Sequence, residues 1–447
     1  MERRGWLSRL RLCAFGIAIA AVAAGCAIGG SGGEAIPGAG TAGDGTIKLV
    51  LWGGVPPEAG PDSIVKAWNA SHPGIALEYA RFVNDDDGNL KLDTALMAGQ
   101  QVDLYFNYSL SQLERRIDAG IALDLSRFDD YDPDLKMGAD AEAWKVDGKY
   151  YGVPTKKNAF FVALNKEALD EAGLPVPTSW TWSELREYAR ALSGTFKYGL
   201  LQHMEPFSDP MDSLLVHEGY ANASGRSNMD HPHLAYWLTT LREMMTEDRT
   251  TPPYGEQVTS KMPVEQMFLN GEAAMLNIGE WLMRSANNTA EYPRDFTIAF
   301  APVPRLSERA DEFVTRGGLG DVISINPKSA HIEAAWEFVQ WYADGGMLPM
   351  SEGGRLPASR DADMDAAMSY FLGDKLELYD VSSLEYVLYG DKTPTFVRSV
   401  PQPLLDMRVD EYEKFFLGDQ SLERTLANMK RRHEAHIGSG GDAGAIE

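Results

Sequence analysis

The sequence predicts an α/β protein, because short apolar segments of strand type alternate with amphipathic segments of helix type along most of the chain. The first elements show the pattern clearly. Residues 47–52 and 75–82 are strand-like, and residues 62–71 between them are helix-like and end before Pro73. At 447 residues the chain exceeds one typical domain, and we expect two.

The first block of elements continues with a helix, a strand and another helix. The helix is expected over residues 90–98, where Gly99 can adopt the left-handed conformation that ends many helices. A strand over residues 103–106 and a helix over residues 109–119 follow. Strands separated by helices in this way are the building unit of the α/β class.

A second block begins near Ala159, with a strand expected over residues 160–165. Thr181 and Glu184 have the spacing of a capping box, which predicts a helix from there to Leu192. The remaining elements of this block are expected as strands at 198–201, 273–276, 296–300 and 321–325, and as helices at 210–218, 233–247, 260–269 and 330–342. The final part, residues 353–432, is expected to be helical and loop-like.

The N-terminus has the features of an export signal. Four arginines precede an apolar run over residues 12–21, and small residues follow up to Gly25. The run is too short to span a membrane, which takes ~20 apolar residues. Cys26 after the small residues resembles the cysteine of a bacterial lipobox, which is lipid-modified and becomes the first residue of the mature protein. Ala23 departs from that pattern, which usually has leucine there, and an ordinary signal peptide with an incidental cysteine is the alternative.

The expected mature N-terminus, residues 26–45, is rich in Gly, Ala and Ser and is predicted to be a flexible linker behind the lipid anchor. The other cysteine, Cys13, lies inside the signal, so the mature chain would contain no disulfide bond. The formal net charge of −24 argues against nucleic acid as a partner and against direct adhesion to anionic lipid. We attribute the acidity to solubility.

Six segments of the body together resemble a known family, the extracellular solute-binding proteins of bacterial ABC importers, family 1, of the carbohydrate type. Each segment is a weak signal alone, but their order and spacing are specific. The segments are LDTALMAGQQVD (92–103), DGKYYGVP (147–154), TSWTWSEL (178–185), FLNGEAAM (268–275), GGLG (317–320) and LPA (356–358). The C-terminal third is longer than in the smallest members and is similar to that of the larger oligosaccharide or glycan binders of Gram-positive bacteria.

The resemblance implies a periplasmic-binding-protein-like clamshell of two lobes, each a sheet flanked by helices, with crossings near residues 155–158, 300–304 and 345–349. Binding would close the lobes on the ligand by a hinge motion. The expected ranges are a signal peptide at 1–25, a linker at 26–45, an N-terminal lobe of 46–157 with 301–346, a C-terminal lobe of 158–300 with 347–438, and a flexible tail at 439–447. The implied partners are a sugar or oligosaccharide and the transmembrane subunits of an ABC permease. We expect a monomer that needs no cofactor.

Candidate ligand contacts follow from the rule that ligands of open α/β sheets lie beyond the carboxyl ends of the strands. Sugar recognition needs flat aromatic rings for the C–H faces of a pyranose and paired donors and acceptors for its hydroxyl groups. The residues that meet both conditions are Trp52, Asn107, Tyr108, Gln202, Glu280 and Trp281, with Arg316 as a forked donor. Asn277 also follows the strand expected at 273–276, and His203 is expected to be structural.

Other readings of the sequence remain beside this one. The acidic loop at 84–89 suggests calcium, but the twelfth position counted from Asp85 is Leu96 and not glutamate, so we expect a solvated turn and no metal. No histidine spacing predicts zinc, and neither a nucleophile elbow nor a phosphate-binding loop occurs. We therefore expect no catalysis. A surface glycan hydrolase or lyase, and a sensor that presents its ligand to a membrane kinase, are the alternative functions.

Overall fold

The structure is a computed structural model, and it describes residues 45–202, 210–307, 313–391, 393–397, 400 and 402–441. The expected signal peptide, Cys26, nearly all of the linker and His203 lie outside these residues. Among the helices that are described, none combines the length and the apolar character that crossing a membrane requires.

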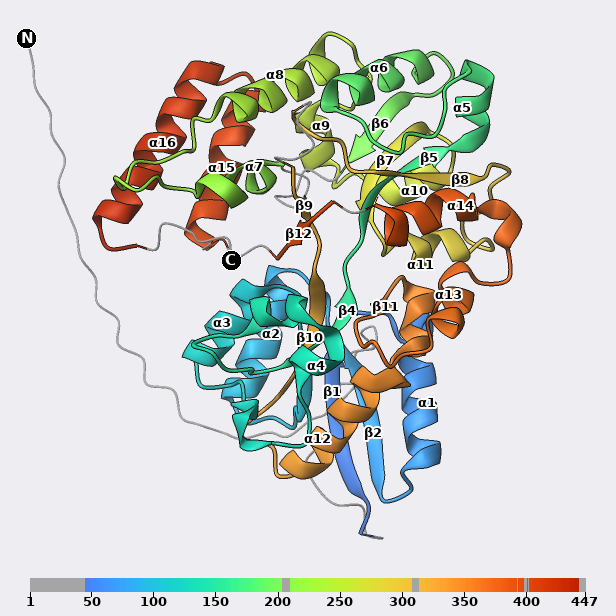
Figure 1. Cartoon of the computed structure of the whole chain (residues 1–447), viewed down its shortest axis with the longest axis vertical. Helices are drawn as coiled ribbons and strands as arrows, with labels where there is room; N and C mark the ends of the chain where they lie inside the picture. Colours follow the sequence, from blue (N-terminus) through green and yellow to red (C-terminus); the bar gives the residue numbers. More distant parts are fainter. Residues whose placement is uncertain are drawn as a thin grey trace, which may run out of the picture. The chain divides into compact units, whose positions relative to one another are not determined.

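A six-stranded mixed sheet forms the centre of the first half of the body (Figure 1). Strand β1 pairs in parallel with β2 and β3, while β10 runs antiparallel to both β3 and β4. The strands lie in the order β11 (Leu356–Pro357), β4 (Val153–Lys157), β10 (Leu319–Ile325), β3 (Leu104–Asn107), β1 (Ile47–Gly53) and β2 (Ile75–Arg81).

Helices cover this sheet, and β1 shows why the sequence allows it. Leu49 and Leu51 point into one apolar cluster, while Val50 and Trp52 point into another, so the strand is buried on both faces. Several of the helices begin where the sequence supplies a cap: Asp85, for example, accepts a hydrogen bond from the Gly88 amide. The main ones are α1 (Pro61–Ser71), α2 (Asp86–Met97), α3 (Leu110–Asp118), α4 (Pro133–Met137) and α12 (Ile332–Trp341).

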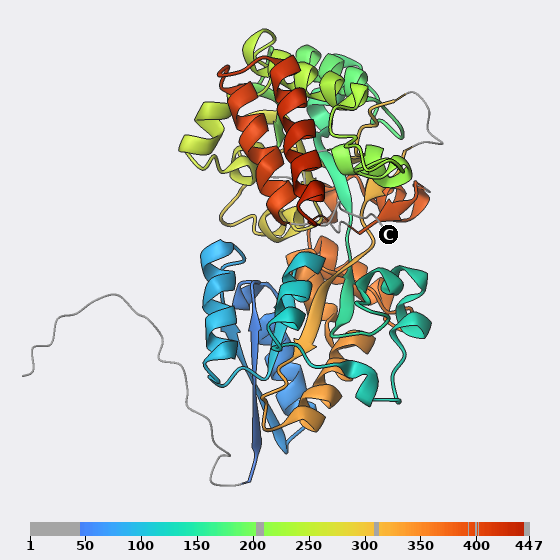
Figure 2. The same cartoon turned by 90° about the vertical axis from the view of Figure 1, so that its left-hand side faces the viewer.

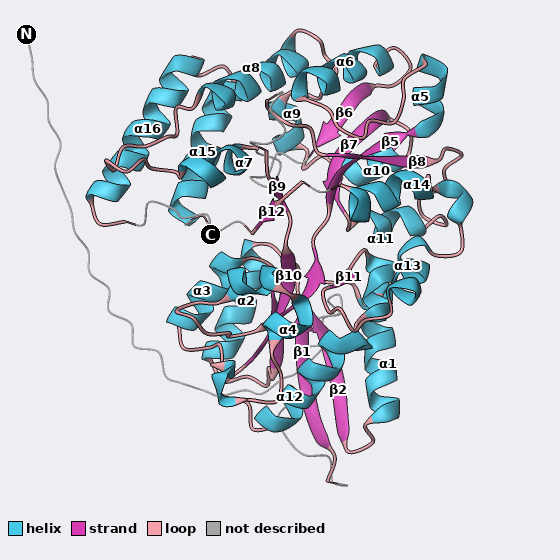
Figure 3. Cartoon of the chain, in the orientation of Figure 1, coloured by secondary structure: helices cyan, strands magenta, loops and turns pink. Residues whose placement is uncertain are grey.

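A four-stranded mixed sheet forms the centre of the second half of the body, and helices flank it as well (Figure 3). Its strands lie in the order β6 (Tyr198–Gln202), β7 (Ala273–Gly279), β5 (Phe160–Asn165) and β8 (Ile298–Pro302). Strand β5 is antiparallel to both of its neighbours, and β6 is parallel to β7. Strands β6, β7 and β8 therefore run in one direction, and their carboxyl ends lie at the same edge as Phe160, the first residue of β5.

Among the described residues, eleven α-helices belong to this second half of the body, which is the half around the four-stranded sheet. Helices α15 and α16 pack against each other and lie side by side in both Figure 1 and Figure 2. The eleven are α5 (Lys166–Ala172), α6 (Trp182–Leu192), α7 (Met211–Glu218), α8 (Pro232–Thr246), α9 (Tyr254–Thr259), α10 (Val264–Leu269), α11 (Leu282–Asn287), α13 (Met364–Leu372), α14 (Val381–Glu385), α15 (Gln402–Phe416) and α16 (Leu422–Gly438). A separate ribbon pairs β9 (Thr315–Arg316) with β12 (Thr395–Phe396).

The predicted α/β class with two helix-flanked sheets is confirmed, and so is the capping box, in which the Thr181 amide donates to the Glu184 carboxylate at 2.7 Å. The helix predicted at 260–269 is wrong in its first part. Helix α9 ends at Thr259, Lys261 adopts a positive φ of 46°, and α10 starts only after Pro263. The left-handed Lys261 and Pro263, two residues later, prevent one continuous helix.

The six-stranded sheet takes its strands from four separate stretches of the chain, whereas the four-stranded sheet lies within residues 160–302. Strand β11 lies in the first sheet, paired with β4, although residues 347–438 are expected in the C-terminal lobe from the sequence. The other lobe boundaries stay predictions.

Candidate functional site

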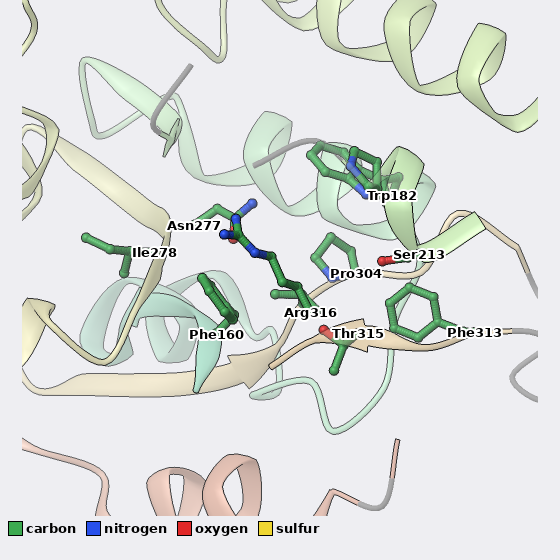
Figure 4. Close-up of a pocket in the computed structure, with 11 residues that line it drawn as sticks. Phe160, Trp182, Ser213, Asn277, Ile278, Pro304, Phe313, Thr315 and Arg316 are labelled. Carbon is green, nitrogen blue, oxygen red and sulfur yellow. The ribbon is translucent and has the colours of Figure 1, made fainter. Parts of the chain in front are cut away.

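A pocket opens at the edge where β6, β7 and β8 end. It contains about 510 Å³ of empty space, with open solvent included. Five segments of the second half of the body line it: the start of β5, the start of α6, the region of α7, the end of β7, and the stretch from β8 to β9. Its aromatic residues are Phe160, Trp182 and Phe313, and its polar residues are Ser213, Asn277, Thr315 and Arg316 (Figure 4).

Arg316 is the cation of this pocket. Its guanidinium carbon lies 5.3 Å from the centre of the Phe160 ring, within the range of a cation–π contact. Figure 4 shows its side chain reaching across the pocket toward Phe160 and Asn277. The backbone after Arg316 requires glycine, because a Cβ on Gly318, whose φ is +68°, would lie 2.7 Å from Val397 Cγ2. The glycine pair predicted beside Arg316 thus lets β9 lie against β12.

Trp281 does not line this pocket itself, but it contacts Phe160, which does. The two rings meet edge to face with centroids 5.8 Å apart. The indole also covers Gly279 closely, since a Cβ there would lie 2.0 Å from Trp281 Cζ3. Trp281 is half-buried at the start of α11. The structure therefore brings two predicted contacts, Trp281 and Arg316, together through Phe160.

Glu280, by contrast, is fully buried and its carboxylate is already engaged. Oε1 lies 2.5 Å from Lys156 Nζ, and Oε2 accepts a hydrogen bond from the Ala159 amide at 2.9 Å. Gln202 is also buried, at the end of β6, in register with Asn277 of β7. Gln202 thus neighbours the pocket through its backbone, while Glu280 is tied to the chain segment between β4 and β5.

The three predicted contacts from the first sheet lie apart from this pocket. Asn107 is buried and accepts a hydrogen bond from Arg116 at 2.7 Å. The Tyr108 hydroxyl accepts one from the Gly54 amide at 2.5 Å, and burial together with the nearby Asp321 carboxylate raises the pKa of this phenol. Trp52 is only 3% exposed, within an apolar cluster. These positions favour packing roles for Trp52 and Asn107.

Sequence reasoning missed Phe160, Ser213, Phe313 and Thr315. Phe160 begins its strand, whereas the rule for open α/β sheets points to residues that follow strands. The antiparallel direction of β5, which places its start at the same edge as the ends of its neighbours, is a property of strand pairing that no local pattern reveals. The apolar run at 160–165 predicts the strand, but it does not predict the direction of that strand in the sheet.

A second, larger cavity is lined from both halves of the body, with about 1600 Å³ of empty space that includes open solvent. Glu58, Arg81 and Glu352 come from segments around the first sheet, and Glu265 and Arg284 from α10 and α11. Burial lowers the pKa of the Arg284 guanidinium, and repulsion from Arg355 and Arg81 adds to this, although Glu265 opposes it at 3.8 Å. This cavity is more polar and more strongly charged than the pocket around Arg316.

The acidic loop at 84–89 forms a helix start. Asp85 caps α2, and the Asn89 side chain donates to Asn84 at 3.0 Å. Across the described part of the chain, no group of three or more His, Cys, Asp or Glu side chains is placed to hold a metal ion.

Comparison with known proteins identifies relatives of this chain. The family model of bacterial extracellular solute-binding proteins matches residues 54–344. A Brucella abortus relative whose name calls it a binding protein is 26% identical over 397 residues, which cover 84% of this chain and 89% of that one. An arabinooligosaccharide-binding protein of Halalkalibacterium halodurans is 23% identical and a Streptomyces antibioticus protein named a lipoprotein is 24% identical, with 67% and 63% of this chain covered and 67% and 64% of theirs.

The fold also matches a solved structure. An ABC substrate-binding protein from Listeria monocytogenes, in complex with cycloalternan, superposes with a TM-score of 0.71 at 20% identity, covering 89% of this chain and all of that one. The predicted family and fold are confirmed by these matches. A family of solute-binding proteins also confirms the expectation of binding in place of catalysis.

Proposed function

The chain belongs to the bacterial extracellular solute-binding protein family, and we propose that it captures a sugar or oligosaccharide and delivers it to the transmembrane subunits of an ABC importer. The observation that carries this proposal is the pocket at the edge of the four-stranded sheet. It combines aromatic rings with a forked cation, an amide and hydroxyl groups around one open pocket.

These groups suit the two surfaces of a pyranose. The C–H face of the ring can lie on an aromatic side chain such as Phe160, while the hydroxyl groups need partners once water is excluded. Arg316 supplies paired N–H donors in a fixed geometry, and Asn277 supplies both a donor and an acceptor. Two similar proteins support the same chemistry, one named an arabinooligosaccharide-binding protein and one solved in complex with cycloalternan.

Delivery requires that the importer distinguish the loaded protein from the empty one. We propose that the two halves close on the ligand by a hinge motion about the segments that join the two sheets. We also propose that Cys26 carries lipid and that the linker after it holds the body at the outer face of the cell membrane. The relative named a lipoprotein supports the anchor.

A ligand panel tests the sugar proposal. Neutral and acidic oligosaccharides of different linkage are added to the protein, and thermal unfolding is followed. A ligand present at a hundred times its Kd stabilises the folded protein by about 2.7 kcal/mol. A panel in which no sugar raises the melting temperature, while another solute class does, would contradict the proposal.

Arg316→Gln makes that result specific to the pocket. Loss of a charged donor to a bound hydroxyl is expected to weaken binding of the sugar found in the panel by about 1.5–3 kcal/mol, roughly tenfold to a hundredfold in Kd. The matched control is Arg424→Gln, an exposed arginine at the start of α16. Calorimetric titration of both variants gives the comparison, and equal affinities would place the ligand elsewhere.

A further inference from the structure

Four charged side chains lie buried at the junction of the two sheets. Lys156 and Asp321 are 9% exposed, Arg355 is 12% exposed, and Glu280 is 1% exposed. Lys156 belongs to β4 and Asp321 to β10, and Arg355 directly precedes β11, so three of the four come from the six-stranded sheet. Glu280 alone comes from the four-stranded sheet, directly after β7.

The charges pair in a chain. Lys156 Nζ lies 2.5 Å from Glu280 Oε1 and 3.6 Å from Asp321 Oδ1, and Arg355 Nε donates to Asp321 Oδ2 at 3.2 Å. Two cations and two anions make the set neutral. Such a set is costly to bury, because each ion loses its hydration, and it is stable only while all partners stay in place. Removal of one member leaves an uncompensated charge in the interior.

The backbone around Glu280 is fixed just as closely. Its amide donates to the Ala159 carbonyl at 3.0 Å, while its Oε2 accepts from the Ala159 amide at 2.9 Å, so the residue grips the link between β4 and β5 from both sides. Gly354 presses on it as well, since a Cβ there would lie 2.2 Å from the Glu280 carbonyl oxygen. The link itself is held to the first sheet by Asn158, which donates to the Leu319 carbonyl at 2.9 Å.

The chain after each member of this pair leads to the candidate site. Phe160 follows the link at Ala159, and Trp281 follows Glu280, and their rings meet edge to face. We propose that Lys156 and Glu280 are a positioning pair: their buried contact fixes how the four-stranded sheet is held against the six-stranded sheet, and thereby where Phe160 and Trp281 stand, without contact to the ligand.

The alternative is that the pair only adds stability. A measurement of the distance between the two sheets separates these roles, and it needs no ligand, so it stands even if the proposed sugar function fails. Cysteines are introduced at the exposed positions Lys66 of α1 and Glu187 of α6 in the full chain, with Cys13 and Cys26 replaced by serine. Fluorescent labels on them report the distance distribution by single-molecule energy transfer.

We expect one narrow distribution for the parent chain. In Glu280→Gln we expect that distribution to broaden or to shift, because Lys156 keeps only the more distant Asp321. The double variant Lys156→Met/Glu280→Leu replaces the pair by apolar side chains of similar size, which often preserves stability. It should keep a melting temperature close to the parent value and still show the altered distribution.

Arg408→Met is the matched control. Arg408 pairs with Asp212 at 2.7 Å, both side chains are 1% exposed, and both belong to helices of the second half, α15 and α7. Its loss should lower the melting temperature and leave the distribution unchanged. An unchanged distribution in folded Glu280→Gln, or in the double variant if the single one does not fold, overturns the proposal. An equal change in Arg408→Met overturns it too, because the effect would then belong to any lost buried ion pair.

Discussion

The two sheets differ at the edges where their strands end, although the same topological rule predicts a ligand site at both edges. At the edge of the six-stranded sheet, the polar side chains are used by the protein itself: Arg116 contacts Asn107, Asn89 and Asp93 at 2.7–2.9 Å. At the edge of the four-stranded sheet, Arg316 faces an open pocket lined by aromatic rings. A polar side chain that borders a pocket is therefore a better candidate for binding than one buried within a network of hydrogen bonds.

The largest effect is expected when the hydrogen bonds of Arg116 at the edge of the six-stranded sheet are removed. Arg116→Met leaves three polar groups without their charged partner in a region where Arg116 itself is 1% exposed. We expect a loss of about 3–5 kcal/mol in the free energy of unfolding, which denaturant titration measures. The pocket variant Arg316→Gln should cost far less stability. Similar losses in both variants would remove the distinction between the two edges.

Local sequence patterns predict part of the fold and of the candidate site, and the rest depends on tertiary contacts. Short apolar segments predict most of the strands, because a strand buried on both faces reads as a continuous apolar run, whereas the two-sheet architecture follows from the family resemblance. Glu280, Asn107 and Asn277 all follow strands predicted from the sequence, and no local feature tells them apart. Their roles depend on Lys156 and Arg116, which are 124 and 9 residues away and become neighbours only through folding. Commitment of a polar group is a tertiary property.

Trp281→Ala tests whether the edge of the four-stranded sheet binds ligand. The ring is half-buried on Gly279 and Phe160, so its loss removes packing as well as a surface for a sugar. We expect Kd for the sugar found in the panel to rise by about tenfold to a hundredfold, as for other aromatic stacking platforms. Affinity by calorimetry and melting temperature are measured together. A core tryptophan would instead cost ~3–5 kcal/mol of stability with unaltered affinity, and that outcome would show Trp281 to be a packing residue.

Gly318→Ala tests whether the backbone holds Arg316 in the pocket. The left-handed φ of +68° costs an L-residue roughly 1–2 kcal/mol, and the new Cβ would press on Val397. We expect a loss of that size in stability together with weaker ligand binding, because β9 carries Arg316. Gly148→Ala is the control, since its φ of +72° imposes similar strain in open space far along the chain from β9. Equal effects of both variants on affinity would mean that the position of β9 is unimportant.

The smallest effect concerns pH and a carboxylate that belongs to neither edge. Asp248 is 8% exposed; its burial raises the pKa, but hydrogen bonds from Arg186 and Arg190 outweigh this and lower the pKa below its ordinary value. A depressed folded pKa contributes stability that is fully present above the unfolded value, near 3.9, and is lost as the pH falls through the lower folded value. Asp248→Asn should therefore flatten the acid side of the stability profile and leave the slope near neutral pH unchanged. Denaturant titrations from neutral to acid pH measure this.

An Asn variant whose acid slope equals that of the parent would show that the ion pairs with Arg186 and Arg190 do not distinguish the folded from the unfolded chain. Ligand affinity at neutral pH should stay the same, because Asp248 lines neither the pocket around Arg316 nor the larger cavity.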